Sequence, residues 1–168
     1  TPGRPFADTL NYMENLVKAG VDIFDVDLGC YDNWWLPHPP AGMPSGCFLD
    51  VSKVAKEYFA ARGIKSNAGV EVPIVAVGKL GYPDIAEKAL RDGKCDMVGM
   101  CRGILAEREW VKKCAEGRED ELRYCISCMN CFNVNPFSYE QTNCSVNPFA
   151  LREGSKRPIV QDGDGRLV

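Results

Sequence analysis

The sequence predicts an α/β protein in which parallel strands alternate with helices. Three short apolar runs, at 21–28, 72–77 and 95–100, alternate with segments whose apolar residues recur at helical spacing. The run 72–77 holds no charged residue, which is typical of strands covered on both faces, as in parallel sheets. This alternation indicates repeated βα units.

The helix before the first strand and the helix after it carry recognisable end signals. Residues 6–19 form an amphipathic helix, and Gly20 follows as its stop. Asp50 is expected to cap a second helix over 51–62. The buried stripe of this second helix is expected to consist of Val54, Ala55, Tyr58 and Phe59.

The remaining helices lie in the second half of the chain. Pro83 occupies the first position of a helix that runs to about residue 91. Residues 104–116 are predicted to be helical, with a break near 106–107. Between the first strand and the second helix, residues 29–48 form a long loop, and long loops inside compact domains are usually functional.

Composition excludes several classes of protein. The chain has 168 residues and a net charge of −3, so a nucleic-acid partner is not expected. No apolar run reaches the roughly 20 residues that a membrane span needs, and no signal peptide is expected. The nine cysteines, an odd number, argue against a closed disulfide framework and indicate a reducing cytoplasm. Cys95 and Cys101 are expected to be small core residues.

Three strands leave two architectures open. A complete eight-fold barrel needs roughly 250 residues, more than this chain holds. A free-standing parallel sheet of three strands would leave both of its edges unpaired. The chain is therefore either a small open α/β sheet or a piece of a larger barrel.

Four cysteines near the end of the chain have metal-ligand spacing. They follow the pattern C-x2-C-x2-C-x12-C and are Cys125, Cys128, Cys131 and Cys144. Three close thiolates and a remote fourth are typical of a cubane iron–sulfur cluster, in which each cysteine binds one iron corner. Zinc is the alternative, although structural zinc sites usually show two separated pairs. A segment without metal is the third possibility.

Loops after the three strands are the expected ligand-binding positions of such a fold. His38 lies in the loop 29–48, where it either donates a proton to substrate or belongs to an ordered aromatic lid. Gly78 and Lys79 form a turn that is either structural or an anion cradle. Arg102, at the start of a helix, either binds phosphate or forms a surface pair.

These residues together resemble one group of enzymes. The segments Ala-Val-Gly-Lys-Leu (76–80), Asp-Met-Val-Gly-Met-Cys-Arg (96–102), Cys-Ile-Ser-Cys-Met-Asn-Cys (125–131) and Cys-Ser-Val-Asn-Pro (144–148) resemble the iron–sulfur flavoenzymes of the old yellow enzyme superfamily. This group includes 2,4-dienoyl-CoA reductase, 2-enoate reductase, trimethylamine dehydrogenase and NADH:flavin oxidoreductases. The cysteine spacing is more similar to trimethylamine dehydrogenase, whereas the histidine loop is more similar to the enoate reductases.

The resemblance implies a fold and a set of site residues. Residues 1–117 would hold the last three strands of an FMN-binding TIM (β/α)8 barrel, 118–150 a 4Fe–4S segment, and 151–168 a linker or hairpin toward a nucleotide-binding domain. His38 would be the proton donor, and the four cysteines would hold the cluster. The positions that match the FMN phosphate site are Gly78, Lys79, Met100, Cys101 and Arg102.

The resemblance also implies a reaction. NAD(P)H would reduce FAD in the nucleotide-binding domain, and single electrons would pass through the cluster to FMN. FMN would give hydride to the β-carbon of an unsaturated acid or acyl-CoA while an acid protonates the α-carbon. The first barrel half and the nucleotide domain are not in these residues, so the segment alone is expected to be inactive. An amine dehydrogenase, a non-catalytic iron–sulfur or zinc module and a homo-oligomer stay open.

Overall fold

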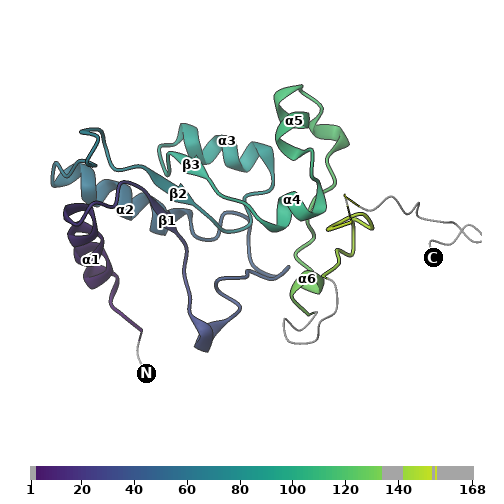
Figure 1. Ribbon diagram of the computed structural model, residues 1–168, viewed down its shortest axis with the longest axis horizontal. Coiled ribbons are helices and arrows are strands. Elements are labelled where there is room, and N and C mark those ends of the chain that lie inside the picture. Colours follow the sequence, from purple (N-terminus) through teal and green to yellow (C-terminus); the bar gives the residue numbers. More distant parts are fainter. Residues whose placement is uncertain (1–2, 134–141, 153, 155–168) are drawn as a thin grey trace, which may run out of the picture.

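The computed structural model describes residues 3–133, 142–152 and 154. At its centre lies a three-stranded sheet made of β1 (Phe24–Val26), β2 (Ile74–Ala76) and β3 (Met97–Val98). The strands lie side by side in the order β1-β2-β3, and both pairs are parallel (Figure 1). In register, Phe24 lies opposite Ile74 and Val75 lies opposite Met97. The predicted parallel α/β fold is confirmed, with strands shorter than the apolar runs that predicted them.

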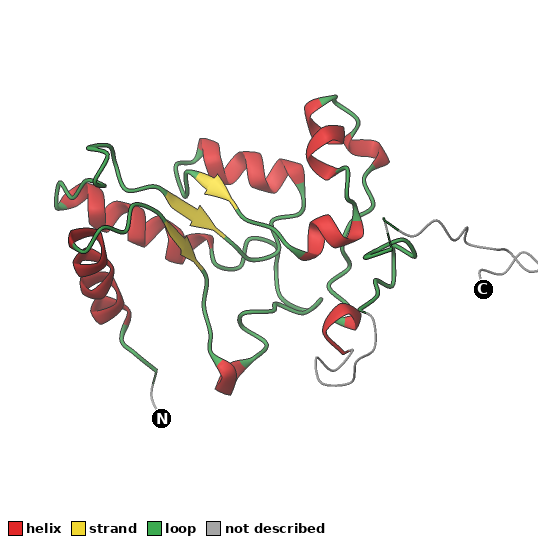
Figure 2. Cartoon of the chain, viewed as in Figure 1, coloured by secondary structure: helices red, strands yellow, loops and turns green. Residues whose placement is uncertain are grey.

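Helices connect and flank the strands, as Figure 2 shows. α1 (Phe6–Lys18) precedes β1, α2 (Leu49–Ala61) connects β1 to β2, and α3 (Pro83–Arg91) connects β2 to β3. After β3 come α4 (Arg102–Ala106) and α5 (Trp110–Ala115), so the predicted break of the last helix is confirmed. The short turns are η1 (Tyr31–Asn33), η2 (Glu119–Glu121) and α6 (Asn130–Asn133).

The core lies between the helices and one face of the sheet. Ile74 and Ala76 of β2 are fully buried on this face, because alternate residues of a strand point the same way. Val17 of α1 and Phe59 of α2 pack in the same cluster as Ile74. Val75, which points to the opposite face, is only half-buried. The expectation that both faces are covered is therefore wrong for the described residues, where the helices cover one face only.

The start of α2 differs from the prediction. The helix begins at Leu49, and Phe48 stands at the N-cap without a side-chain cap. Asp50 is not the cap but lies in the first turn, where its charge still complements the helix dipole. Val54 is 42% exposed, and Ser52 takes the expected buried place. Phe48, only 2% exposed, shifts the helix start because its ring must enter the core.

The two single cysteines predicted as core residues behave differently from each other. Cys95 is buried and packs with Ala76, Leu80 and Ala89, as predicted. Cys101 is exposed, because it follows β3 at the rim of the sheet rather than lying within the strand. Within the described ranges, no helix combines the length and apolar character that crossing a bilayer requires.

Candidate functional site

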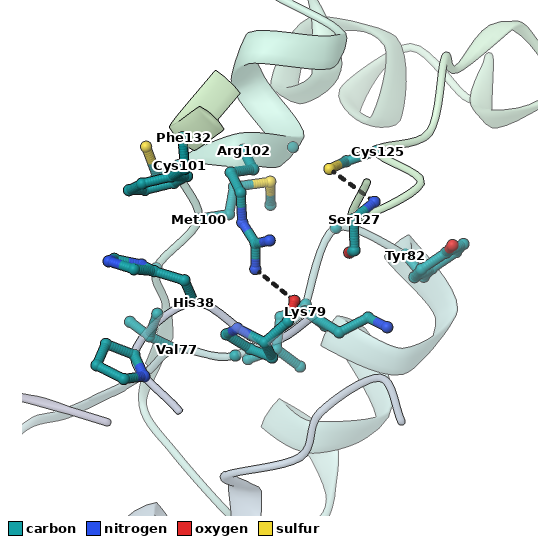
Figure 3. Close-up of a pocket in the computed structure, with 17 residues that line it drawn as sticks. His38, Val77, Lys79, Tyr82, Met100, Cys101, Arg102, Cys125, Ser127 and Phe132 are labelled. Carbon is teal, nitrogen blue, oxygen red and sulfur yellow. Dashed lines mark hydrogen bonds between the residues drawn. The ribbon is translucent and has the colours of Figure 1, made fainter. Parts of the chain in front are cut away.

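A cavity of about 220 Å³ opens beyond the carboxyl ends of β2 and β3. Loops from all three strands contribute to its wall, which is where ligands bind in parallel α/β folds. Every residue that the sequence predicted for the proton donor and the phosphate site lines this cavity (Figure 3). They are His38, Gly78, Lys79, Met100, Cys101 and Arg102. The fold thus brings together residues that lie up to 64 positions apart in the sequence.

The turn after β2 requires its glycine. Gly78 has a φ of 127°, a conformation that other residues rarely adopt. A Cβ atom at this position would lie 2.7 Å from the Phe48 ring and 3.3 Å from the Cys47 sulfur. Lys79 follows with a φ of 53°, and Leu80 is buried with 1% of its surface exposed. The turn is therefore fixed to the core on both sides of Lys79.

The side chain of Lys79 reaches the histidine loop. Its ammonium donates hydrogen bonds to the carbonyl oxygens of Pro40 at 3.1 Å and Ala41 at 3.0 Å, and also to that of Met43. An ammonium has three N–H donors, so these bonds use all of them. No local sequence pattern predicts this contact, because the loop and the turn are nearly forty residues apart in the chain.

Arg102 connects two loops that enter the site from opposite directions. Nη2 donates to the Pro39 carbonyl at 2.9 Å, which Figure 3 marks with a dashed line, and Nη1 contacts Met129 Sδ at 3.0 Å. The guanidinium has five N–H donors, so other donors remain after these two contacts. Arg102 is half-buried and, among the described residues, forms no ion pair.

His38 lies between two aromatic rings. The Trp34 ring meets it edge-on at 4.5 Å between centroids, and the Phe132 ring lies 4.1 Å away on a tilt of 31°. Burial, and then the positive charge of Arg102, hold the pKa of His38 below its ordinary value of 6.5, while Asp27 opposes them. Burial and the charge of Arg102 both favour the neutral form of the imidazole. Sequence reasoning missed Phe132, although an aromatic residue directly after a candidate ligand was an available signal.

The four candidate cluster ligands surround a second, smaller hollow. Cys125, Cys128, Cys131 and Cys144 all line it. Two residues of the cysteine loop have positive φ angles, Ser127 at 52° and Met129 at 64°. These left-handed residues bend the backbone of the loop around the hollow. Such alternation of backbone conformation forms the concave nests that hold anions and many iron–sulfur clusters.

Local bonds and charges act on these thiols. The Ser127 N–H donates to Cys125 Sγ at 3.4 Å. A hydrogen bond to the Ser145 hydroxyl lowers the pKa of Cys128. Burial raises the pKa of Cys131, the charge of Arg102 opposes it, and the neighbouring Cys125 and Cys144 raise it further. The remote fourth cysteine, Cys144, is thus close enough to act electrostatically on Cys131.

The four cysteines line one hollow but do not converge on a single point. Within the described ranges, no group of three His, Cys, Asp or Glu side chains converges to hold one metal ion. A tetrahedral zinc site would bring four ligands to one ion, whereas in a cubane each cysteine binds a different iron corner.

The two cavities share a wall. Arg102, Cys125 and Ser127 line both the larger cavity and the cysteine hollow. Parallel βα units with a site at the carboxyl ends of the strands occur both in barrels and in open α/β sheets. The solved structures below match the barrel. The larger cavity and the hollow beside it are the places in that barrel where two groups could lie next to each other.

Comparison with known proteins identifies the kind of barrel. No protein-family model matches the chain. NADH oxidase from Thermoanaerobacter brockii is 34% identical over 147 residues, which are 87% of this chain and 21% of that protein. Cinnamate reductase from Clostridium sporogenes is 30% identical over 151 residues, or 90% of this chain and 21% of the reductase. The chain thus spans about a fifth of the length of these curated relatives.

Solved structures agree in fold. The complex of 2-naphthoyl-CoA reductase with 2-naphthoyl-CoA matches 92% of this chain and 22% of its own, with a TM-score of 0.74 and 25% identity. Histamine dehydrogenase from Rhizobium sp. 4-9 matches 88% of this chain and 19% of its own, with a TM-score of 0.71 and 24% identity. Both are TIM-barrel flavoenzymes, and the three parallel strands match part of that barrel. The chain fits the old yellow enzyme superfamily and corresponds to a fragment of the length of the proteins that it matches.

Proposed function

We propose that this chain belongs to an NADH-dependent oxidoreductase, with FMN and a 4Fe–4S cluster, that reduces an activated C=C bond of the 2-enoate or 2,4-dienoyl-CoA type. The shared wall of the two cavities carries the proposal. It sets a candidate proton donor, a candidate phosphate cradle and four thiols next to one another. The names of two similar proteins, a cinnamate reductase and a naphthoyl-CoA reductase, support the substrate class.

The two turns after β2 and β3 would hold the FMN phosphate. Gly78 and Lys79 at one turn and Met100, Cys101 and Arg102 at the other face the same cavity. Their backbone N–H groups suit phosphate oxygens, because glycine and left-handed residues let the backbone approach an anion closely. The remaining N–H donors of Arg102 would add charge-assisted hydrogen bonds.

His38 would supply the proton. FMN held in this cavity would supply hydride to the β-carbon, and His38 would deliver the proton to the α-carbon that completes the single bond. His38 lines the cavity, and its ring is held by Trp34 and Phe132, so its nitrogen atoms have a defined direction. NADH is the overall reductant, and one proton is consumed with each hydride transferred.

The cysteine segment would hold a one-electron relay between FAD and FMN. The thiolates of Cys125, Cys128, Cys131 and Cys144 would bind the cluster, and the Ser127 N–H bond to Cys125 would stabilise the reduced form. Residues 1–117 would be the barrel part, 118–150 the cluster segment and 151–168 a linker. Most of that last segment lies outside the described residues. The 168 residues alone are not expected to turn over substrate.

Spectra and product analysis test this proposal. Holoprotein purified without oxygen should show flavin absorbance and a band near about 400 nm that bleaches on reduction. It should oxidise NADH with cinnamate or a dienoyl-CoA and release the saturated product. Cys128→Ala should lose iron, whereas Cys114→Ala, outside the hollow, should keep it. Full iron content in Cys128→Ala, or zinc in place of iron, would refute the cluster assignment.

Amine oxidation is the second candidate, because an aromatic-walled cavity also suits an organic cation. His38, Tyr82 and Phe132 line the cavity, and aromatic faces attract ammonium groups. The cysteine spacing of this sequence also resembles that of trimethylamine dehydrogenase. Reduction of the bound flavin by a simple methylated amine, in the absence of NADH, would favour this candidate over alkene reduction.

A further inference from the structure

The histidine loop is fastened to the turn after β2 at two points. Beyond His38, Lys79 Nζ donates to the carbonyls of Pro40, Ala41 and Met43. At its end, the Gly46 N–H donates to the Gly78 carbonyl at 3.0 Å. One point is a side chain and the other is backbone, so a substitution of Lys79 removes the first and leaves the second.

Lys79 is placed for this contact by the geometry of its own turn. Its left-handed backbone and the buried Leu80 next to it fix the direction of the side chain. All three N–H donors of its ammonium are used by loop carbonyls, so none is left for a phosphate oxygen in this arrangement. The side chain therefore contacts the loop rather than an anion.

The position of His38 depends on this loop. Pro39, directly after it, accepts a hydrogen bond from Arg102 at 2.9 Å, and Pro40 accepts one from Lys79. Two cations from the ends of two strands thus hold consecutive carbonyls next to the histidine. Movement of the loop would shift the imidazole relative to the cavity and to the Phe132 ring.

We propose that Lys79 is a positioning residue, whose ammonium clamps the loop 40–43 and so fixes His38 over the cavity. The phosphate oxygens of a bound flavin would then be held by the backbone N–H groups of the turns and by Arg102. The part of this proposal that concerns turnover rests on the proposed function. The part that concerns the loop does not.

Hydrogen exchange of Lys79→Met in the holoprotein tests the clamp. The Met43 amide, which donates to the Pro40 carbonyl, should exchange roughly tenfold faster, because local opening becomes easier. The Gly46 amide should change by less than about twofold, since its backbone anchor remains. Lys88→Met, which removes an exposed lysine of α3, is the matched control and should leave both amides unchanged.

Kinetics and flavin binding separate the clamp from a phosphate ligand. Lys79→Met should lower kcat by about 10- to 100-fold through misplacement of His38, with little change in KM. The Kd for FMN should change by less than about threefold. Lys79→Arg, which keeps the charge and the donors, should recover most of the loop protection and of kcat.

Each outcome decides the proposal. Unchanged exchange at Met43 overturns it, and a much weaker Kd for FMN with an unchanged loop would make Lys79 a phosphate ligand. If the protein reduces no alkene, the proposed function fails, while the exchange result still tests the clamp. If Lys79→Met does not fold, the rate of lysine acetylation in the native holoprotein tests the clamp instead. The side chain of Lys79 should be acetylated roughly tenfold more slowly than that of Lys88. Equal rates would overturn the clamp.

Discussion

Replacement of Gly78 by alanine tests whether the turn after β2 depends on a missing side chain. The new methyl group would meet the Phe48 ring at 2.7 Å and the Cys47 sulfur at 3.3 Å. Phe48 cannot move away easily, because it is 2% exposed and stands at the start of α2. The substitution therefore combines a clash with a backbone conformation that alanine rarely adopts.

The two costs can be assigned magnitudes. Forcing a residue other than glycine to a φ of 127° costs about 1–3 kcal/mol. Overpacking against a fixed ring adds about 1–3 kcal/mol. The free energy of unfolding should thus fall by about 2–6 kcal/mol, a large part of the roughly 5–15 kcal/mol that a domain has.

A glycine with free space is the matched control. Gly93, after α3, has a φ of 66° and no atom within 4 Å of the position of a Cβ. Gly93→Ala should cost only the conformational part, about 1–2 kcal/mol. Urea unfolding of the holoprotein measures both variants. If Gly78→Ala costs no more than Gly93→Ala, the clash with Phe48 does not exist and the packing of this turn is misread.

A second substitution isolates the clash. Phe48→Leu removes ring atoms next to Gly78, so it should make the alanine more acceptable. In a double-mutant cycle the two changes should couple by about 0.5–3 kcal/mol, with the pair costing less than the sum of the singles. Additive effects would contradict direct contact between the two positions.

Three other predictions follow from the site and its support. His38→Gln should lower kcat by about 10²- to 10⁴-fold. The wild-type rate should fall as pH rises through the pKa of His38, below 6.5, because only the protonated imidazole carries the proton to be donated. This fall in rate with rising pH should be absent from the variant. Glu107→Ala should destabilise the protein by about 1–3 kcal/mol in urea unfolding, because it removes the buried carboxylate that accepts from the half-buried Lys113 at 2.7 Å and leaves Lys113 with the Glu121 carbonyl at 3.0 Å as its remaining acceptor among the described residues. Lys88→Ala, from an exposed pair, should cost less than about 1 kcal/mol. Lys79→Met and Arg102→Lys should be non-additive in the same assay, coupling by about 0.5–3 kcal/mol, since both side chains hold one loop; additivity within about 0.5 kcal/mol would contradict this.

The alternation of apolar runs and amphipathic segments was enough to predict the order of elements. Strand β2 and helix α3 lie where periodicity and Pro83 placed them, because backbone propensity and burial agree there. The predicted start of α2 was wrong. Asp50 is a good N-cap residue by local preference, but the helix begins at Leu49, directly after the buried Phe48. Sequence pattern records local preference, whereas the buried ring acts through distant neighbours.

The site was predictable as a set of positions but not as a set of contacts. Parallel strands must bring their following loops to one edge, so His38, Gly78 and Arg102 were expected together, and all three line one cavity. The carbonyl partners of Lys79 were not predictable, since backbone acceptors carry no mark in the sequence. The place of Phe132 directly after a candidate ligand was an available signal, but its ring contact with His38 was not predictable, because that contact joins segments more than ninety residues apart.

Arg102 explains why these separate segments can behave as one site. Its guanidinium lies in the wall common to both cavities, and it contacts the histidine loop at Pro39 and the cysteine loop at Met129. A planar group with five donors can contact a backbone carbonyl and a side-chain sulfur and still face an anion. Its positive charge also lowers the pKa of His38 and opposes the rise in the pKa of Cys131. One residue at the end of β3 therefore links the candidate proton donor, the candidate anion cradle and the candidate cluster thiols, through direct contacts and through its charge.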